Sequence, residues 1–366
     1  MNQPVFSAAE LRAAAESYPD PYLGQTLGTA KAVTDARVGA GVASLDLTLG
    51  FPCADYQDEL RHGLRQHMAA LLGATPLELR LAAQITAHAV QPTLKPLDNV
   101  KNVVAVASGK GGVGKSTTAA NLALAWAAQG ARVGLLDADI YGPSQPTIMG
   151  LAGERPTSPD GKHLTPLQAY GVAVMSIGFL IDAEQPMVWR GPMVTQALTQ
   201  LLGDSTWGEL DYLVVDMPPG TGDIALTLSQ RVPVSGAVIV TTPQDIALLD
   251  ARKGLKMFEK VNVRVLGIVE NMSLHQCSKC GHVEHIFGAG GGAAMARQYG
   301  VPLLGELPLD LRIREDADGG KPTVVSEPDS PRALAYRLMA RRAAAGLATR
   351  NKDYSRLFPK ISVEST

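Results

Sequence analysis

A glycine-rich segment, G-K-G-G-V-G-K-S-T-T at residues 109–118, constrains the fold of this chain more than any other feature. It satisfies the pattern G-x-x-x-x-G-K-[ST] of a phosphate-binding loop. A short apolar run at residues 103–107 precedes it, and an alanine-rich stretch with helical spacing at residues 119–128 follows it. Because the motif binds phosphate between a strand and a helix, this order predicts a nucleotide-binding α/β domain.

The residue types of the loop suit a polyphosphate ligand. Glycines let the backbone adopt positive φ and turn its N–H groups inward, and the following helix N-terminus adds partial positive charge. We expect Lys115 to reach the β- and γ-phosphates and the Ser116 hydroxyl to hold Mg²⁺. The alternative is a plain glycine-rich turn. The nucleotide-binding residues predicted in the loop are Gly109, Lys110, Gly111, Gly112, Val113, Gly114, Lys115, Ser116 and Thr117.

Charge, apolar content and cysteine usage narrow the classes of partner. The 366-residue chain has a net charge of −2 and no basic run, so nothing predicts a nucleic-acid partner. No apolar stretch approaches the roughly 18 residues of a membrane span, and the N-terminus lacks signal-peptide regions. We therefore predict a cytoplasmic protein with no membrane partner. Its three cysteines are too few for a disulfide framework.

Composition along the chain predicts a small domain followed by a larger one. Residues 41–49 alternate like a strand and residues 56–72 have the pattern of an amphipathic helix. Two prolines at positions 92 and 96 discourage regular structure and indicate a linker. The predicted units are a small α/β domain at 1–92, a linker at 93–100, an ATPase domain at 101–347 and a polar tail at 348–366.

The larger domain is predicted to contain a doubly wound, mostly parallel α/β sheet. Its short β-rich runs lie at residues 103–107, 133–136, 172–177, 212–215, 237–241, 265–269 and 302–305. Helical segments alternate with these runs, which is the arrangement of parallel strands joined by right-handed crossovers. Residues 156–166, with Asp-Gly at their centre, are typical of a hairpin insertion.

Two carboxylates, Asp139 and Asp216, lie near the carboxyl ends of predicted strands, where open parallel sheets collect ligand groups. Together with the additional Lys110, the phosphate loop resembles that of the deviant phosphate-loop ATPases, which include the nitrogenase iron protein and cell-division ATPases. The resemblance implies a homodimer in which Lys110 reaches the partner's nucleotide. It also implies that Asp216 holds Mg²⁺ through water, that Asp139 orients the attacking water and that Asp137 is a supporting or capping carboxylate. A strand-end cap is the alternative for Asp216.

The same resemblance suggests roles for Gly220 and Asn271. Gly220 lies in P-P-G-T-G, which resembles a switch segment whose backbone N–H senses the γ-phosphate; a stiff turn is the alternative. Asn271 ends an apolar run where family members place an asparagine on the adenine edge. Its amide both donates and accepts hydrogen bonds, which favours ATP over GTP, although a turn cap has the same residue type.

The pair Cys277 and Cys280 has a C-x-x-C spacing that lets two thiolates converge on one metal. His282 and His285 could complete a zinc site within one chain. Alternatively, the same two cysteines of a dimer partner could complete four thiolates around a [4Fe-4S] cluster. A redox pair is disfavoured because the motif does not begin a helix in a plain βαβ unit.

Further motifs narrow the resemblance. They are N-M-S before C-x-x-C-G-H, I-F-G-x-G-G-G, L-G-E-L-P-L-D, D-A-D-I-Y-G-P-S and W-R-G-P-M. Over residues 100–345 the chain resembles the Mrp/ApbC family of iron-sulfur cluster carrier ATPases. The first 90 residues are similar to a small domain of iron-sulfur assembly factors. Cys53 lies near the position of a reactive cysteine in that domain, but Ala54 replaces the usual proline, and a buried structural thiol is the alternative.

The resemblance implies a homodimeric ATPase that carries an iron-sulfur cluster and delivers it to recipient apoproteins. Three other functions stay open. A positioning or partitioning ATPase should have a basic surface or a terminal amphipathic helix, and neither is evident. A zinc-stabilised nucleotide switch would require the two histidines beside the C-x-x-C pair. An electron-donating reductase is disfavoured because the nitrogenase iron protein is expected to use separated cysteines.

Overall fold

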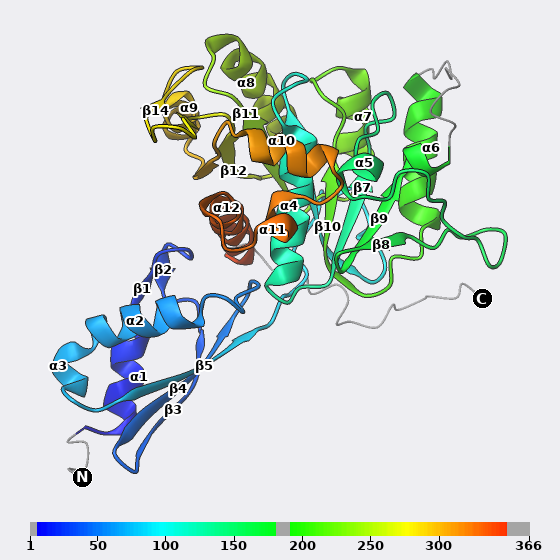
Figure 1. Ribbon diagram of the computed structural model, residues 1–366. Coiled ribbons are helices and arrows are strands. Elements are labelled where there is room, and N and C mark those ends of the chain that lie inside the picture. The colour runs from blue at the N-terminus through cyan, green and yellow to red at the C-terminus, as the bar shows by residue number, and fades with distance from the viewer. Residues whose placement is uncertain (1–5, 181–190, 350–366) are drawn as a thin grey trace, which may run out of the picture.

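The computed structural model describes residues 6–180 and 191–349. It contains a small N-terminal domain and a large C-terminal domain, joined by one extended connection (Figure 1). The first two residues of the W-R-G-P-M motif and most of the predicted polar tail lie outside the described residues.

The small domain is built on a three-stranded sheet in the order β3-β4-β5. Its elements are α1 (Ala8–Glu16), β1 (Pro19–Asp20), β2 (Gln25–Thr26), β3 (Val33–Gly39), β4 (Val42–Leu49), α2 (Gln57–His67), α3 (Ala69–Leu72) and β5 (Leu77–Ala83). Strand β4 pairs antiparallel with β3 and parallel with β5. Every second residue of β4 is buried, as its sequence alternation predicts. The predicted helix at 56–72 is divided at Met68 into α2 and α3.

The large domain contains an eight-stranded sheet in the order β15-β12-β11-β6-β10-β7-β9-β8. The strands are β6 (Val100–Ser108), β7 (Val133–Asp137), β8 (Leu167–Ala169), β9 (Val172–Ser176), β10 (Leu210–Asp216), β11 (Gly236–Thr241), β12 (Val265–Glu270) and β15 (Leu303–Glu306). Strand β8 runs antiparallel to β9, and the other pairings in this sheet are parallel. The predicted α/β class, with a mostly parallel doubly wound sheet, is confirmed.

Helices surround this sheet (Figure 1). They are α4 (Lys115–Ala128), α5 (Gln145–Ile148), α6 (Gly191–Asp204), α7 (Asp223–Arg231), α8 (Asp245–Lys260), α9 (Gly291–Tyr299), α10 (Leu311–Asp318), α11 (Thr323–Ser326) and α12 (Pro331–Ala348). The Trp126 ring of α4 stacks on Tyr212 of β10 at 4.4 Å, and its indole N–H donates to the Ala340 carbonyl of α12 at 2.8 Å. Helix α4 is thereby fixed between the sheet and α12. Within the described residues, no helix is both long and apolar enough to cross a bilayer.

Strand β6 occupies the topological switch point of the sheet. Strands β10, β7 and β9 follow on one side of it, and β11, β12 and β15 follow on the other. Ligands of open α/β sheets bind in the crevice that this reversal creates at the carboxyl ends of the strands. The predicted hairpin insertion is also present, with Thr157 paired to Thr165.

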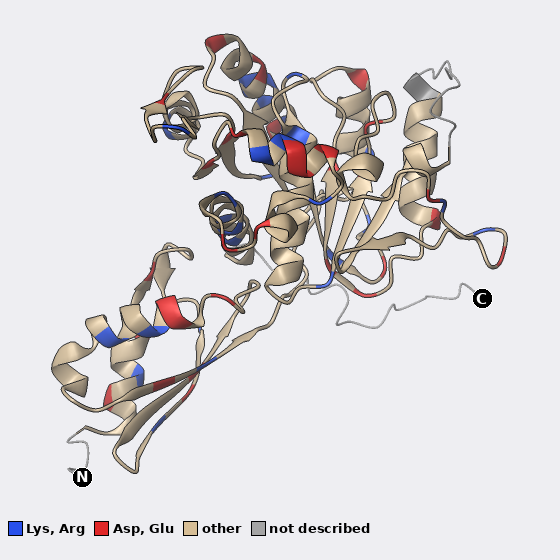
Figure 2. Cartoon of the chain, viewed as in Figure 1, with Lys and Arg blue, Asp and Glu red and all other residues tan. Residues whose placement is uncertain are grey.

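Arg341 of α12 makes a direct contact with the small domain. Its side chain is only 4% exposed, and its guanidinium pairs with Asp55 at 2.7 Å and Glu59 at 2.8 Å. The same group lies 4.9 Å and 4.7 Å from the ring centroids of Tyr22 and Tyr56. Figure 2 shows basic residues on α12 and acidic residues at the start of α2. These five residues form the Arg341 cluster, which joins the two domains.

The connection between the domains is also held by a buried side chain, Gln91. Its Nε2 donates to the carbonyls of Ser229 at 2.8 Å and Val232 at 3.0 Å, and its Oε1 accepts from the Val234 N–H at 2.9 Å. The predicted linker at 93–100 therefore follows a fixed point on the large domain. Its last residue, Val100, already belongs to β6.

We predict that Gln91→Leu lowers the free energy of unfolding of the large domain by about 2 to 4 kcal/mol, because three buried backbone groups lose their partner. Gln129→Leu is the matched control, since Gln129 is buried but its amide atoms have no partner within the described structure. Urea unfolding followed by tryptophan fluorescence measures both variants. Equal losses of stability would contradict the role given to the Gln91 hydrogen bonds.

Candidate functional site

The phosphate loop connects β6 to α4 at the switch point, and its glycines serve different purposes. Gly112 and Gly114 each have φ of +79°, a conformation that favours glycine. A Cβ on Gly109 would lie 2.1 Å from the carbonyl carbon of Asp250 on α8, so this position requires glycine because two backbones meet. A Cβ on Gly111 would have no neighbour within 4 Å. The loop shape therefore depends on α8 as well as on its own sequence.

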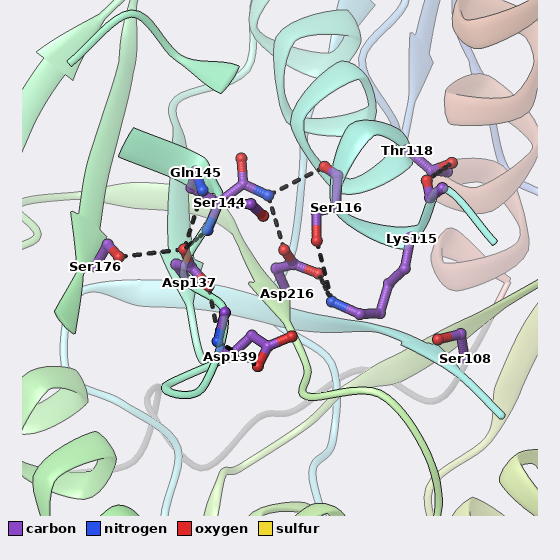
Figure 3. Close-up of polar contacts among 12 residues, drawn as sticks. Ser108, Lys115, Ser116, Thr118, Asp137, Asp139, Ser144, Gln145, Ser176 and Asp216 are labelled. Carbon is purple, nitrogen blue, oxygen red and sulfur yellow. Dashed lines mark hydrogen bonds and ion pairs between the residues drawn. The ribbon is translucent and has the colours of Figure 1, made fainter. Parts of the chain in front are cut away.

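A buried ion pair lies at the centre of the site. The Lys115 ammonium is 2.5 Å from the Asp216 carboxylate, and the two side chains are 6% and 0% exposed. The ammonium also donates to the Ser116 hydroxyl at 3.2 Å. The Gln145 amide donates to Asp216 at 2.8 Å and to the Ser116 carbonyl at 3.0 Å. Figure 3 shows that the predicted phosphate and Mg²⁺ ligands are gathered in this one network.

Asp137, at the end of β7, organises the segment that follows it. Its carboxylate accepts the N–H groups of Asp139 at 3.1 Å and of Ser144 and Gln145 at 3.0 Å each. It also accepts the Ser176 hydroxyl at 3.1 Å. Burial raises the pKa of Asp137 to about 7, and the nearby Asp216 carboxylate adds to this increase. These bonds make Asp137 a cap for the backbone of residues 139–145.

Asp139 has a different environment from Asp137. Its carboxylate accepts the Gly142 N–H at 3.3 Å and points toward the space in front of Lys115 and Asp216 (Figure 3). Burial raises the pKa of Asp139, and the positive charge of Lys115 opposes this increase. Asp139 also lines an open cavity of about 390 Å³ together with Tyr141 and the segment that contains Pro218 and Pro219. The Asp139 carboxylate is therefore accessible from this cavity.

Two other predicted residues, Lys110 and Gly220, lie in or beside the loop. Lys110 is partly exposed, and no ion pair of its side chain occurs within the described residues. The Gly220 N–H, predicted to sense phosphate, donates to the Ser108 carbonyl at 3.0 Å in this conformation.

Asn271 is buried against the phosphate loop. Its side-chain N–H₂ donates to the Val113 carbonyl at 2.9 Å, and a Cβ on Gly114 would lie 2.1 Å from the same nitrogen. One N–H of Asn271 thus supports the loop, while its predicted contact with adenine stays a prediction.

The C-x-x-C pair lies on a short hairpin between β13 (His275–Gln276) and β14 (Val283–Glu284). The Cys277 N–H donates to the His282 carbonyl at 2.9 Å and the Gly281 N–H donates to the Cys277 carbonyl at 2.8 Å. The backbone N–H groups of Cys280 and Lys279 donate to the Cys277 sulfur and lower the pKa of its thiol. Both cysteines are free, and Cys280 is exposed. The hairpin therefore presents a pair of thiols, and the pKa of the Cys277 thiol is lowered.

The neighbouring histidines do not complete a metal site with these thiols. His282 lies 3.5 Å from Glu284, and the His285 Nδ1–H donates to the Ser273 carbonyl at 2.7 Å. In the parts of the chain that the structure describes, no three His, Cys, Asp or Glu side chains are grouped to hold a metal ion. In this conformation one chain offers Cys277 and Cys280 as two ligands.

Cys53 lies apart from this chemistry, in the hydrophobic core of the small domain. It is 3% exposed, and burial raises the pKa of its thiol to about 11. A thiol in this environment is largely protonated at neutral pH and reacts slowly.

The sequence interpretation missed Gln145 and Ser176, which position Asp216 and Asp137. Neither has a distinctive motif, because an amide or hydroxyl is recognised as functional only from the group it contacts. The position of Gln145 directly after D-A-D-I-Y-G-P-S is the one available signal.

We predict that Gly109→Ala lowers nucleotide affinity by at least about 100-fold, because an added methyl group cannot coexist with the Asp250 backbone and the loop must shift. Gly111→Ala is the matched control and should keep affinity within a few-fold. Calorimetric titration with MgADP measures both. Loss of binding in both variants would show that the contact with α8 does not decide which loop glycine can carry a side chain.

Comparison with known proteins identifies relatives of this chain. Residues 99–344 match a family model described as ParA, the NUBPL iron-transfer P-loop NTPases. The iron-sulfur cluster carrier protein of Pseudomonas fragi is 60% identical over 285 residues, which cover 78% of this chain and 99% of that protein. The iron-sulfur cluster carrier protein of Escherichia coli K12 is 51% identical over 331 residues, which cover 90% of each chain.

A solved structure of a nucleotide-binding protein is also similar to this chain. A nucleotide-binding protein of Archaeoglobus fulgidus, solved in complex with ADP, has 40% sequence identity and a TM-score of 0.57, and the match covers 65% of this chain and 92% of that chain. The resemblance inferred from the motifs is confirmed by these matches. The chain belongs to the family of iron-sulfur cluster carrier proteins, which are P-loop NTPases.

Proposed function

We propose that the protein is a homodimeric ATPase that holds a [4Fe-4S] cluster between two copies of the chain and delivers it to recipient apoproteins. The observation that carries the proposal is the solvent-facing Cys277–Cys280 hairpin, which supplies two thiol ligands from a domain that also contains a phosphate loop. Two ligands are half of the four thiolates that such a cluster requires. A second copy related by two-fold symmetry supplies the other half.

The nucleotide part of the proposal rests on the network around Lys115. On binding of MgATP, Lys115 turns from Asp216 to the β- and γ-phosphates, and Ser116 and Asp216 become available to Mg²⁺, the latter through water. Asp139 faces the same space and orients the water that attacks the γ-phosphate. Such a carboxylate does not have to be a strong base, because positioning and electrostatics dominate phosphoryl transfer.

The dimer part of the proposal gives Lys110 a role across the interface. Lys110 belongs to the phosphate loop, but among the described residues the ion pair of this loop is made by Lys115, and Lys110 makes none. In the proposed dimer its ammonium neutralises phosphate charge on the nucleotide of the partner. Gly220 then senses the γ-phosphate by exchanging its bond to the Ser108 carbonyl, and Asn271 offers its second N–H to adenine.

The alternative of a zinc-stabilised nucleotide switch has less support. It needs both His282 and His285 as ligands beside the two thiols, whereas the described residues hold no group of three or more such side chains placed to bind a metal ion. A positioning ATPase would leave the exposed C-x-x-C hairpin without a purpose.

Asp139→Asn should keep MgATP binding and lower the turnover number by about 100-fold or more, since a positioned carboxylate is worth that much in the transition state. Lys115→Ala should instead abolish binding, because it removes the cation that neutralises the phosphates. Calorimetry and a phosphate-release assay separate the two effects. Normal hydrolysis by Asp139→Asn would remove the catalytic role given to this residue.

Cys277→Ser and Cys280→Ser should eliminate cluster assembly and leave nucleotide binding intact. His282→Ala and Cys53→Ser are the matched controls and should retain the cluster, because neither is needed for a site of four thiolates. Anaerobic reconstitution, with iron, sulfide and zinc counted, measures all four variants. We expect about four irons per dimer in the controls. One zinc per chain that is lost in His282→Ala would favour the zinc switch instead.

A further inference from the structure

The two oxygens of the Asp216 carboxylate have different partners. Oδ1 accepts from the Lys115 ammonium at 2.5 Å, and Oδ2 accepts from the side-chain N–H₂ of Gln145 at 2.8 Å. Under the proposed function the first bond is exchangeable, because Lys115 turns to the phosphates when nucleotide binds. The second bond involves no phosphate ligand. Gln145 is therefore the donor to Asp216 that does not have to move when nucleotide arrives.

The same nitrogen of Gln145 also bonds the first turn of α4. Nε2 donates to the Ser116 carbonyl at 3.0 Å as well as to Asp216, so both of its hydrogens are used (Figure 3). Ser116 and Asp216 are the two residues proposed to hold Mg²⁺, and they belong to different elements, α4 and β10. One side-chain amide on α5 thus bridges the two residues of the proposed metal site and fixes their separation.

The chemistry of this bridge explains why position 145 carries an amide. The Asp216 carboxylate and the Ser116 carbonyl only accept hydrogen bonds, so both need an N–H donor. The other end of the amide, Oε1, is buried with no hydrogen-bond partner among the described residues. Burying an unpaired oxygen is unfavourable, so packing alone would favour an apolar side chain at this position. The two bonds of Nε2 are therefore what a glutamine contributes here.

Gln145 is itself held in place at its backbone and along its side chain. Its N–H donates to the Asp137 carboxylate at the end of β7 at 3.0 Å, and the whole residue is 0% exposed. Pro146 follows it in the first turn of α5, where the fixed φ of proline suits a helix start. A side chain that is anchored at its base and packed on all sides can hold another group in a defined position.

We propose that Gln145 is a positioning residue for Mg²⁺, because it fixes Asp216 relative to Ser116 when Lys115 moves to the phosphates. Mg²⁺ requires near-ideal octahedral geometry and usually keeps several waters, so a carboxylate that holds the ion through water has to be well oriented. Partners that orient metal-binding carboxylates typically contribute about 10- to 100-fold to metal affinity. The inference rests on the proposed function, because it assigns a further residue to the same Mg²⁺ site.

The experiment measures ADP binding to the full-length protein by calorimetry, in EDTA and at a series of Mg²⁺ concentrations. Gln145→Met keeps a side chain of similar length and removes both N–H donors. It should weaken Mg²⁺ binding to the protein–ADP complex by about 10-fold or more and keep the affinity for ADP in EDTA within a few-fold. A merely structural role would instead weaken ADP binding equally with and without Mg²⁺.

A second variant and a matched control complete the set. Gln145→Asn keeps a polar amide in the site but is one methylene shorter, so it cannot bond Asp216 and Ser116 together, and Mg²⁺ binding should again be weakened. Gln129→Met is the control, since Gln129 is also a buried glutamine but its amide atoms have no partner within the described structure. This control should keep the natural dependence of ADP binding on Mg²⁺.

The outcomes separate this inference from the proposed function. Natural Mg²⁺ affinity in Gln145→Met or Gln145→Asn would overturn the role of Gln145, as would an equal loss in Gln129→Met or an absence of any Mg²⁺ effect in the natural protein. The titration needs neither hydrolysis nor a cluster. A natural protein that binds MgADP but neither hydrolyses ATP nor assembles a cluster would therefore reject the proposed function and leave this result unchanged.

Discussion

The buried ion pair between Lys115 and Asp216 is the interaction on which the large domain depends. Taking both charges out of water is costly, and the cost is offset only because hydrogen bonds satisfy the remaining atoms. Here Ser116 and Gln145 supply those bonds from the start of α4 and of α5. The pair therefore fixes β10, α4 and α5 relative to one another. Under the proposed function, phosphate and Mg²⁺ would take over the same two charges.

The large sheet was predictable because its strands are buried on both faces. Strands such as β6 and β10 appear in the sequence as continuous apolar runs, and the helical segments between the runs indicate parallel pairing. The small domain was harder. Strand β3 contains Asp35 and Arg37, which pair with each other on an exposed surface, so its pattern lacks a clear apolar side. Strand β8 has three residues and gives no periodic signal.

Residues of the candidate site were predictable from the sequence where they belong to a motif. They were not predictable where only the packing of distant segments brings them to the site. Lys115, Asp139 and Asp216 belong to motifs, and the fold brings their side chains into one space. Asn271 was expected to face a ligand, but its bond to Val113 depends on the relative placement of β12 and the phosphate loop. The left-handed backbone of Met272 had no signal at all, since methionine does not favour that conformation.

The Arg341 cluster has a consequence for dividing the chain experimentally. Arg341 is almost fully buried, and the carboxylates and rings that surround it come from the other domain. Cutting the chain at the connection between the domains would expose a guanidinium without partners on one fragment and two uncompensated carboxylates on the other. Each isolated fragment would then have a surface that the intact chain never presents to solvent. To separate the domains without leaving these charges unpaired, Arg341, Asp55 and Glu59 would all have to be replaced by uncharged residues.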